Sequence, residues 1–524
     1  MAKYSKKFFT LTAVFLITSM VTVLFFSGVN VKAYVFGSKY YYLYLERDNL
    51  KELKNTYKEY YKEKNLSENS YECSAKAKLD GDLMKYDEEM KTAADYLCKL
   101  NFNIKYNSNN KDLKNRYYTL YLGADYNNKE FVDIDIKSAD DKLIIALPSL
   151  TEKTVGMDYP ETTAMTADFI NAFLDDDKAF EKIFGLSRAD YDCMVERYLK
   201  NAVFDQIPEN KVVFSDDSNY ENIKCNSITF NIDKEVIANI YKALAKELEN
   251  DKDIRTLCYS VSRSFMEFVK LEEQEIDYEE PSIEEIDEEI KNMCENLKEK
   301  AENIEDIQLA YTAYFKNSGD IISRQLNEKE NGTSVILSRY KDLLGNDIFS
   351  FNVKDNQDSV FEIKNTMRLQ SGIYNGQCNL DLSGRNLFKA AYTYEKDAKV
   401  GGLDAFVGDI EGKISMEALE DMEYSSADDS PLSDIYFNFS NKRTDNDILQ
   451  GKAAFTSQID GKRMGISIFT QVKQSNTAGI DKPDMSFDKV TTLDDEEGME
   501  AFTDDISESF QEKIIGLILS DSLE

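Results

Sequence analysis

The chain has 524 residues, of which 97 are acidic and 63 are basic, so its formal net charge is −34 at pH 7. A surface this negative repels nucleic acid and anionic lipid headgroups and favours cations and basic partners, so we expect no nucleic-acid partner. The sequence contains neither histidine nor tryptophan. The lack of histidine excludes Ser-His-Asp and Cys-His catalysis and every histidine-ligated metal site.

The N-terminal stretch 8–29, FFTLTAVFLITSMVTVLFFSGV, carries no charge. As a helix it would span roughly 33 Å, which is close to the hydrocarbon thickness of a bilayer. Lysines at its short N-terminal side place the N-terminus in the cytoplasm by the positive-inside rule. We therefore expect a single-pass cell-membrane protein whose bulk is extracytoplasmic. Val31-Lys32-Ala33 leaves open the alternative of a cleaved signal segment and a secreted protein.

The next segment, up to residue 275, is expected to alternate between helices and strands. The aromatic run KYYYLYL at 39–45 either lies at a membrane interface or begins the fold. A charged helix follows at 46–64, and the period then changes to two: Tyr71, Cys73, Ala75, Ala77 and Leu79 alternate with polar residues, as in a half-buried strand. A helix is predicted at 86–99, followed by strands at 102–106, 116–126, 130–137 and 143–147 with an Asn127-Asn128 turn. A helical region at 160–204 has a cap at Ser187. Strands at 211–215 and 224–232 precede a helix capped by Asp233, and helices continue to about residue 270.

Residues 271–281, LEEQEIDYEEP, form the predicted domain boundary because they are acidic and poor in apolar side chains. Ser282 and Glu285 then make a capping box at the start of a helix. Residues 305–472 are expected to be mostly strand, and the last of these strands has an apolar face made by Met464, Ile466, Ile468 and Val472. Asn331-Gly332 and Asp460-Gly461 are expected hairpin turns, and a terminal helix is expected at about 500–520.

These elements predict an α+β protein in which an N-terminal transmembrane helix precedes two antiparallel-sheet domains, curved meanders or half-barrels, packed with helices. The predicted divisions are 1–33 for the cytoplasmic stub and the anchor or signal segment, 34–275 for a first α+β ectodomain, and 276–524 for a second, β-rich ectodomain with a C-terminal helix.

Motifs for catalysis and for metal binding are weak. S-x-x-K occurs at Ser108, Ser338 and Ser486, which chance alone explains, and neither S-D-N nor K-T-G accompanies it. The acidic runs 175–177 and 494–497 lack the spacing of a calcium loop and fit a solvated helix end and a loop better. No nucleotide cradle is present. We assign no catalytic, cofactor-binding or metal-binding residue and expect no cofactor; the ligand-binding residues stay open.

Two compositional features concern the interior. The seven cysteines contain no C-x-x-C and do not form a disulfide framework, so most are expected to be buried small residues. The 32 tyrosines and 30 phenylalanines either fill an ordinary core or leave an apolar cavity that accepts an acyl chain.

The segments KYYYLYLERDNLKELK at 39–54, KEFVDIDIKSADDKLIIALPSL at 129–150 and NYENIKCNSITFNIDKEVIANIYKAL at 219–244 resemble membrane-anchored cell-envelope proteins of low-GC Gram-positive bacteria, a domain family of unknown function. The helix-then-meander plan is also similar to the half-barrels of periplasmic lipoprotein carriers. That second resemblance implies a concave apolar face closed by a helix, and fold similarity alone does not establish function.

The leading functional hypothesis is a non-enzymatic binding protein that is attached to the membrane through residues 8–29. Its partner would be a lipid, a lipoprotein, an envelope polymer or a basic envelope protein. The alternatives are a carboxylate-based cell-wall hydrolase and a structural or assembly partner in the envelope.

Overall fold

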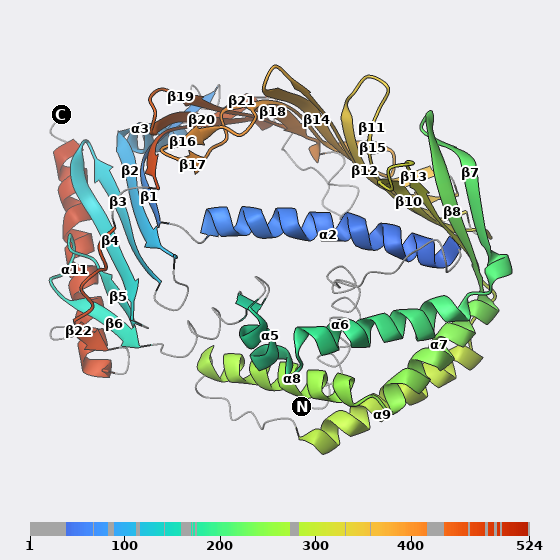
Figure 1. Cartoon of the computed structure of the whole chain (residues 1–524). Coiled ribbons are helices and arrows are strands. Elements are labelled where there is room, and N and C mark those ends of the chain that lie inside the picture. Colours follow the sequence, from blue (N-terminus) through green and yellow to red (C-terminus); the bar gives the residue numbers. More distant parts are fainter. Residues whose placement is uncertain are drawn as a thin grey trace. The chain divides into compact units, whose positions relative to one another are not determined.

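The computed structural model describes most of the chain after residue 37, and the described residues are 38–65, 68–81, 88–111, 116–140, 142–158, 169, 171–172, 176–272, 282–330, 332–356, 358–416, 434–459, 462–476, 480–486, 490–492 and 495–521. The chain forms two compact units that are interleaved in sequence (Figure 1). Unit 1 comprises Met1–Tyr60 and Met165–Lys364, and unit 2 comprises Tyr61–Ala164 and Asn365–Glu524.

Unit 1 contains a helical layer with its own apolar core. Its helices are α5 (Asp177–Phe184), α6 (Arg188–Arg197), α7 (Lys234–Glu249), α8 (Lys252–Glu272) and α9 (Ile283–Glu302), and α6 continues through a π-helical turn, Tyr198–Val203, into two short 3-10 turns, Phe204–Gln206 and Glu209–Lys211. The caps predicted from sequence are present, because the side chains of Ser187, Asp233 and Ser282 accept backbone N–H groups at the starts of α6, α7 and α9. Met194, Ile254 and Ile290 are among the side chains buried between these helices.

The sheet of unit 1 is an antiparallel run whose apolar side is covered by a helix. Its strands pair in the order β7 (Val212–Tyr220), β8 (Ile223–Asp233), β9 (Gln308–Phe315), β10 (Ile321–Glu328), β11 (Ser334–Lys341) and β12 (Asp347–Asp355). The helix α2 (Ser38–Asn65) packs Tyr42 against Phe230 and Tyr311, with ring centroids 5.3 and 5.8 Å apart. The aromatic run at 39–45 therefore begins the fold, as one of the two expectations had it.

Polar contacts fix α2 on unit 1. The buried Lys39 ammonium donates to the carbonyl oxygens of Phe204 and Ile207 at 3.0 and 2.9 Å, where a positive charge complements the end of the helical segment. Further along, the Arg324 guanidinium donates to both carboxylate oxygens of Glu46 at 2.8 and 2.6 Å. Burial alone would lower the pKa of Arg324, but the hydrogen bonds and the charge of Glu46 outweigh it and raise that pKa.

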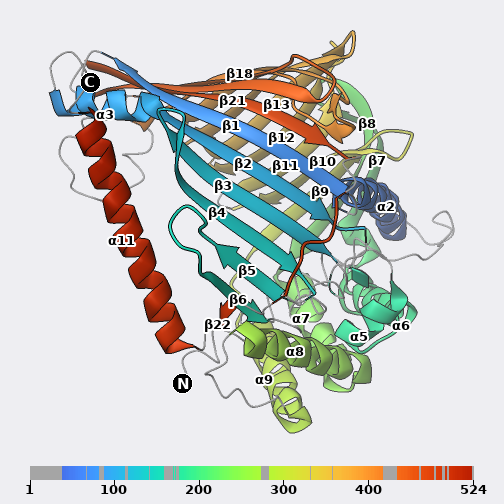
Figure 2. The ribbon, with the colours of Figure 1, turned by 90° about the vertical axis from the view of Figure 1, so that its left-hand side faces the viewer.

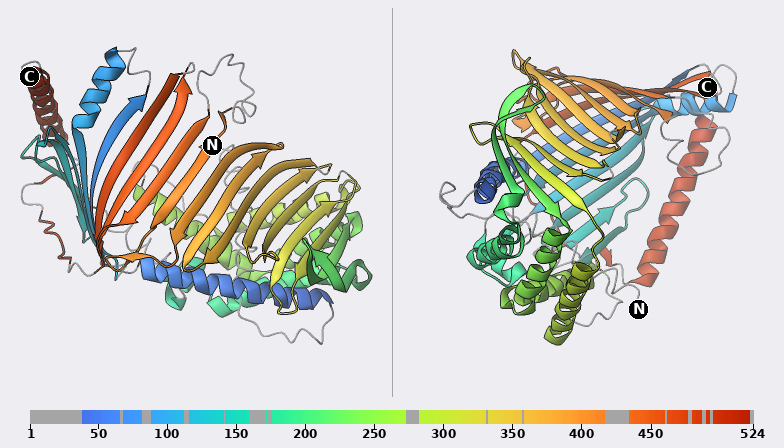
Figure 3. Two further views of the ribbon diagram at one scale, coloured as in Figure 1. Left: turned by 90° about the horizontal axis from the view of Figure 1, so that it is seen from above. Right: turned by 90° about the vertical axis from the view of Figure 1, so that its right-hand side faces the viewer.

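Unit 2 is a broad antiparallel sheet with helices at its margins (Figures 2 and 3). Its strands pair in the order β14 (Ile373–Leu382), β15 (Arg385–Glu395), β18 (Gly408–Ile414), β19 (Ile435–Arg443), β20 (Ile448–Ile459), β21 (Lys462–Ser475), β1 (Glu68–Gly81), β2 (Leu100–Asn109), β3 (Tyr117–Tyr126), β4 (Lys129–Ala139), β5 (Lys142–Ala146), β6 (Thr154–Asp158) and, in parallel, β22 (Val490–Thr492). A small ribbon, β16 (Lys399–Val400) with β17 (Leu403–Asp404), lies in the β15–β18 connection.

Two helices belong to this sheet. α3 (Glu88–Lys99) leads directly into β2, and α11 (Glu496–Asp521) follows β22. α11 contacts β4 through the rings of Phe510 and Phe131, whose centroids are 5.7 Å apart, and through Lys513, which donates to the Phe131 carbonyl oxygen at 2.8 Å. The remaining strand, β13 (Asp358–Gln370), contains the boundary between the two units.

The predicted fold class is wrong in its arrangement of sheets. The sequence predicts two successive sheet domains, whereas twenty of the described strands belong to one hydrogen-bonded sheet. The physical reason is a long-range pairing: β1 follows the first helix, but it pairs along its length with β21, nearly the last strand of the chain. An alternating pattern indicates that a strand exists, but it does not indicate which distant strand pairs with it. Much of the expected boundary at 271–281 lies outside the described residues.

The predicted membrane anchor is not supported. No helix in the described part of the chain is long and apolar enough to cross a membrane, and this finding contradicts the predicted single-pass cell-membrane localisation. Residues 8–29, on which that prediction rested, lie outside the described residues.

Candidate functional site: an apolar sheet face in unit 2

The strand register of unit 2 gathers apolar side chains on one face of the sheet. Residues paired directly across an antiparallel ladder point to the same side, and successive residues of a strand point to opposite sides. The pairing follows Gly376, Tyr392, Ile410, Phe439, Ala453, Ile468 and Ala77 across seven strands. It continues through Ala75, Phe102 and Ala124 across β1, β2 and β3 to Val132 of β4. We call this surface the apolar face.

The apolar face is long, and its charges lie at strand ends. Ten strands from β14 to β4 span about 43 Å at the usual spacing of about 4.8 Å. By register, four charged residues of the described strands lie on this side. Lys129, Arg385 and Lys462 stand at the starts of β4, β15 and β21, and Arg443 stands at the end of β19. The opposite face, which we call the polar face, carries charged residues along the strands: Glu72, Lys76, Lys78, Lys105, Asp125, Asp133, Asp135, Lys137, Lys389, Asp409, Glu411, Lys413, Lys442, Lys452, Arg463 and Lys473.

Glycines allow rings to lie across the apolar face. A Cβ atom at Gly376 would collide with the ring of Tyr392, and a Cβ atom at Gly412 would collide with the ring of Phe437. The aromatic side chains therefore cover the backbone of a neighbouring strand, an arrangement known to stabilise glycine in sheets. The Tyr392 hydroxyl fixes its ring by donating to Asn365 Oδ1 at 2.7 Å.

The centre of the apolar face is not packed into a core. In the described residues, the large clusters of buried apolar side chains belong to unit 1, and the two smaller clusters of unit 2 lie at margins of its sheet. Ile410, Phe439 and Ile468 are half-buried, and Phe102 and Ile104 are 40% and 38% exposed. A one-sided antiparallel sheet normally buries its apolar face, so this surface is available to an apolar ligand.

Along β1 the apolar face has a strip of small side chains, Cys73, Ala75 and Ala77. Larger neighbours stand on both sides: Ile466, Ile468 and Val472 come from β21, and Phe102 and Ile104 come from β2. Burial raises the pKa of the Cys73 thiol, so the strip is uncharged at neutral pH.

One end of this strip is rich in hydroxyl groups. Tyr71 and Tyr106 are paired and stacked with ring centroids 6.2 Å apart. Tyr118 pairs with Ser108 on the next ladder, and Ser108 pairs with Asn69. We call these five residues the tyrosine edge.

The β15–β18 connection folds over the same margin of the sheet. Its Ala398 and Val400 pack with Leu449, and Val472 lies against this cluster. Gln474 Nε2 donates to the Val400 carbonyl oxygen at 2.9 Å, which holds the connection in place. Gly401 has a positive φ of 56°, and a Cβ atom there would collide with the backbone of Gln474, so the close approach needs glycine.

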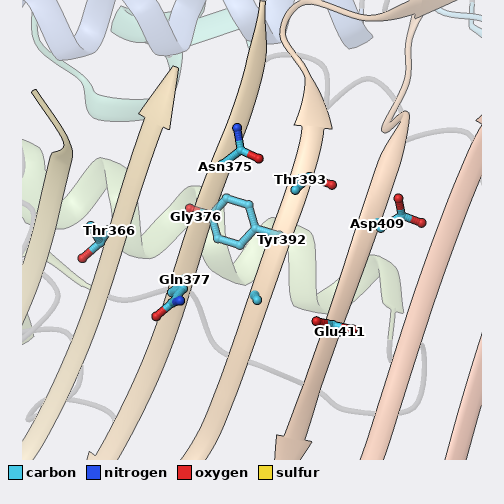
Figure 4. A pocket seen from close by; sticks show the side chains of 9 residues that line it. Thr366, Asn375, Gly376, Gln377, Tyr392, Thr393, Asp409 and Glu411 are labelled. Carbon is cyan, nitrogen blue, oxygen red and sulfur yellow. The ribbon is translucent and has the colours of Figure 1, made fainter. Parts of the chain in front are cut away.

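A second, polar depression lies over β13–β15 and β18 (Figure 4). It has a volume of about 650 Å³, and its lining includes Asn375, Gln377, Asp409 and Glu411. Both carboxylates are exposed and belong to the polar face. The depression therefore lies on the side of the sheet opposite to the apolar face.

The described residues of the weak sequence motifs make ordinary structural hydrogen bonds. Ser338 is buried and its hydroxyl lies 2.5 Å from that of Tyr220, while the Ser486 hydroxyl donates to Asp484 at 3.3 Å. Asp176 caps α5, and Asp495 accepts the Gly498 N–H at the start of α11. Asp175 and Asp494 lie outside the described residues.

No family model matches this chain. No curated protein matches it either. Among solved structures, the crystal structure of Pseudomonas aeruginosa OccK5 (OpdH) matches with 6% sequence identity over 78% of this chain and 98% of that chain, at a TM-score of 0.17. A similarity this low supports no inference about fold or function.

Proposed function

We propose that this protein binds lipids and holds their acyl chains on the apolar face of unit 2. The observation that carries the proposal is the register of the sheet, which joins the apolar sides of ten strands into one surface whose centre remains half-exposed. Transfer of acyl methylenes from water to such a surface is favourable by about 0.8 kcal/mol for each one that becomes buried.

The chemistry of the surface favours an acyl chain over a polar polymer. Along the strip Cys73–Ala77 and its neighbours Ile468 and Phe102, the side chains offer contact area and no charged group. Sugar or peptide polymers placed there would lose hydrogen bonds to water without replacement. A flexible hydrocarbon chain has no such cost.

The length of the strip also suits an acyl chain. Tyr71 and Leu79 are eight residues apart on β1, which corresponds to about 26 Å at about 3.3 Å per residue. One leaflet of a bilayer is about 15 Å deep, so a single extended acyl chain fits along this strand.

Native mass spectrometry of the purified full chain, followed by lipid extraction, tests the proposal. We expect acyl-containing species in a fixed ratio to protein, and direct binding of a fluorescent palmitoyl probe after those species are removed. Protein that carries no acyl species and does not bind the probe would overturn the proposal.

A further inference from the structure

We infer that the tyrosine edge receives the polar headgroup of the lipid, and that this headgroup is uncharged and rich in hydroxyl groups, as in a glycosyl diacylglycerol. The inference rests on the proposed function and specifies its ligand. It comes from the chemistry at the end of the β1 strip, where the apolar face changes from aliphatic to hydroxyl-bearing side chains.

Tyrosine hydroxyl groups gather at the Tyr71 end of the strip. From Tyr106, the apolar side of β2 continues through Ile104 to Phe102, a distance of about 13 Å, comparable with one bilayer leaflet. Tyr71, Tyr106 and Tyr118 supply hydroxyl groups at the other end. A lipid whose chain lies beside Ile104 and Phe102 therefore brings its headgroup to the tyrosine edge.

The tyrosine edge contains a buried hydroxyl without a partner. Ser108 is 1% exposed, and its Oγ atom has no hydrogen-bond partner among the described residues. Buried hydroxyl groups of this kind are rare because each one costs free energy unless a bound group satisfies it. A hydroxyl-bearing headgroup can donate to or accept from this atom.

Among the described residues near this edge, three cations have carboxylate partners. Lys111 lies 3.1 Å from Glu68, Arg443 lies 2.8 Å from Glu395, and Lys473 lies 3.9 Å from Asp447. A phosphate headgroup requires cations or a helix N-terminus that can pair with it. The net charge of −34 adds a repulsive field for any anionic lipid.

Aromatic rings also suit a sugar. The stacked pair Tyr71 and Tyr106 presents ring surface and hydroxyl groups together, as carbohydrate recognition requires. A sugar ring can pack on this surface while its hydroxyl groups exchange hydrogen bonds with the edge.

The test is a competition titration in which unlabelled lipids displace the palmitoyl probe from the full chain. We compare monoglucosyl diacylglycerol with phosphatidylglycerol that carries the same acyl chains. The expected result is that the glycolipid displaces the probe at a concentration at least about tenfold lower, which corresponds to one or two neutral hydrogen bonds.

A double variant, Tyr106→Phe with Tyr118→Phe, removes hydroxyl groups and keeps the rings. It should lose most of the glycolipid preference while its affinity for the palmitoyl probe stays the same. The control Tyr121→Phe alters the same strand on the polar face and should change neither quantity.

The outcomes separate the two proposals. If the wild-type chain does not bind the probe, the proposed function itself fails. If the probe binds but phosphatidylglycerol competes as well as the glycolipid, the headgroup inference is overturned and acyl binding stands. A glycolipid preference that persists in the double variant overturns the role of the tyrosine edge.

Discussion

Ile468 offers the sharpest test of the apolar face, because its neighbour Phe469 points to the other side of the same strand. The cross-strand partners of Ile468 are the small residues Ala453 and Ala77, so its side chain extends further from the sheet than theirs do. We expect Ile468→Glu to weaken binding of the palmitoyl probe strongly. The matched control Phe469→Glu adds the same charge on the polar face.

The magnitude follows from the surroundings of the two positions. A carboxylate among hydrocarbon costs about 2.5–3.5 kcal/mol at full burial, and Ile468 is half-buried, so we expect a loss of about 2 kcal/mol, or roughly thirtyfold in Kd. At position 469 the new carboxylate would lie between Lys452 and Lys76, its cross-strand partners, which stabilises the sheet slightly.

Fluorescence titration with the palmitoyl probe measures both affinities, and urea unfolding checks that both variants remain folded. If both variants bind the probe as tightly as the wild type, the apolar face is not the binding surface. Equal losses in the two variants would point instead to a general effect of negative charge.

Three further predictions concern the strip and the attachment of α2. Ala77→Phe fills the strip and should raise the Kd for the palmitoyl probe roughly tenfold by displacing about two methylenes, with no change in unfolding; an unchanged Kd would count against the strip. Because burial raises the pKa of Cys73, its thiolate fraction at neutral pH is small, and maleimide should modify Cys73 more slowly than the exposed Cys98. The modification of Cys73 should become faster as the pH rises toward that pKa, and it should become slower when lipid is bound to the protein. Arg324→Met leaves the Glu46 carboxylate, which is 15% exposed, without its guanidinium partner, and should lower the free energy of unfolding of the full chain by about 2 kcal/mol in urea titrations. Recovery of stability in the double variant with Glu46→Gln would confirm the cause. A loss of stability below about 0.5 kcal/mol would refute it.

Local signals in the sequence predicted much of the secondary structure. The caps at Ser187, Asp233 and Ser282 depend on residues within three positions, and they form as expected. The Asn127-Asn128 turn has positive φ angles of 51° and 60°, as a two-residue hairpin turn requires. These features need no information from distant parts of the chain.

The candidate site was only partly visible in the sequence. The alternating patterns in 71–79 and 464–472 both predict strands, but the predicted boundary at 271–281 places these strands in different domains. The structure pairs Cys73 with Val472 and Ala77 with Ile468, so the two apolar sides become neighbours. Pairing between residues about 400 positions apart cannot be predicted from the sequence of either strand, because both alternating patterns would equally suit an ordinary buried core.

The sequence predicts the helix only from residue 46, whereas α2 begins at Ser38, because the first turns of α2 are determined by contacts with distant residues. Tyrosine-rich KYYYLYL has strong strand propensity, and the charged pattern that favours a helix begins only at residue 46. Packing of Tyr42 and Leu45 into the core of unit 1 decides in favour of the helix. Tertiary contacts override local preference where the buried aromatic area is large.

The half-exposed apolar face also has a consequence for handling the protein. Hydrocarbon-like surface of this extent is a hazard in water, since two empty molecules can bury it against each other. The strongly charged polar face and the overall negative charge oppose such association, and salt would weaken that protection. Delipidated preparations should therefore tend to self-associate in concentrated salt, and restoring the lipid should return them to the monodisperse state.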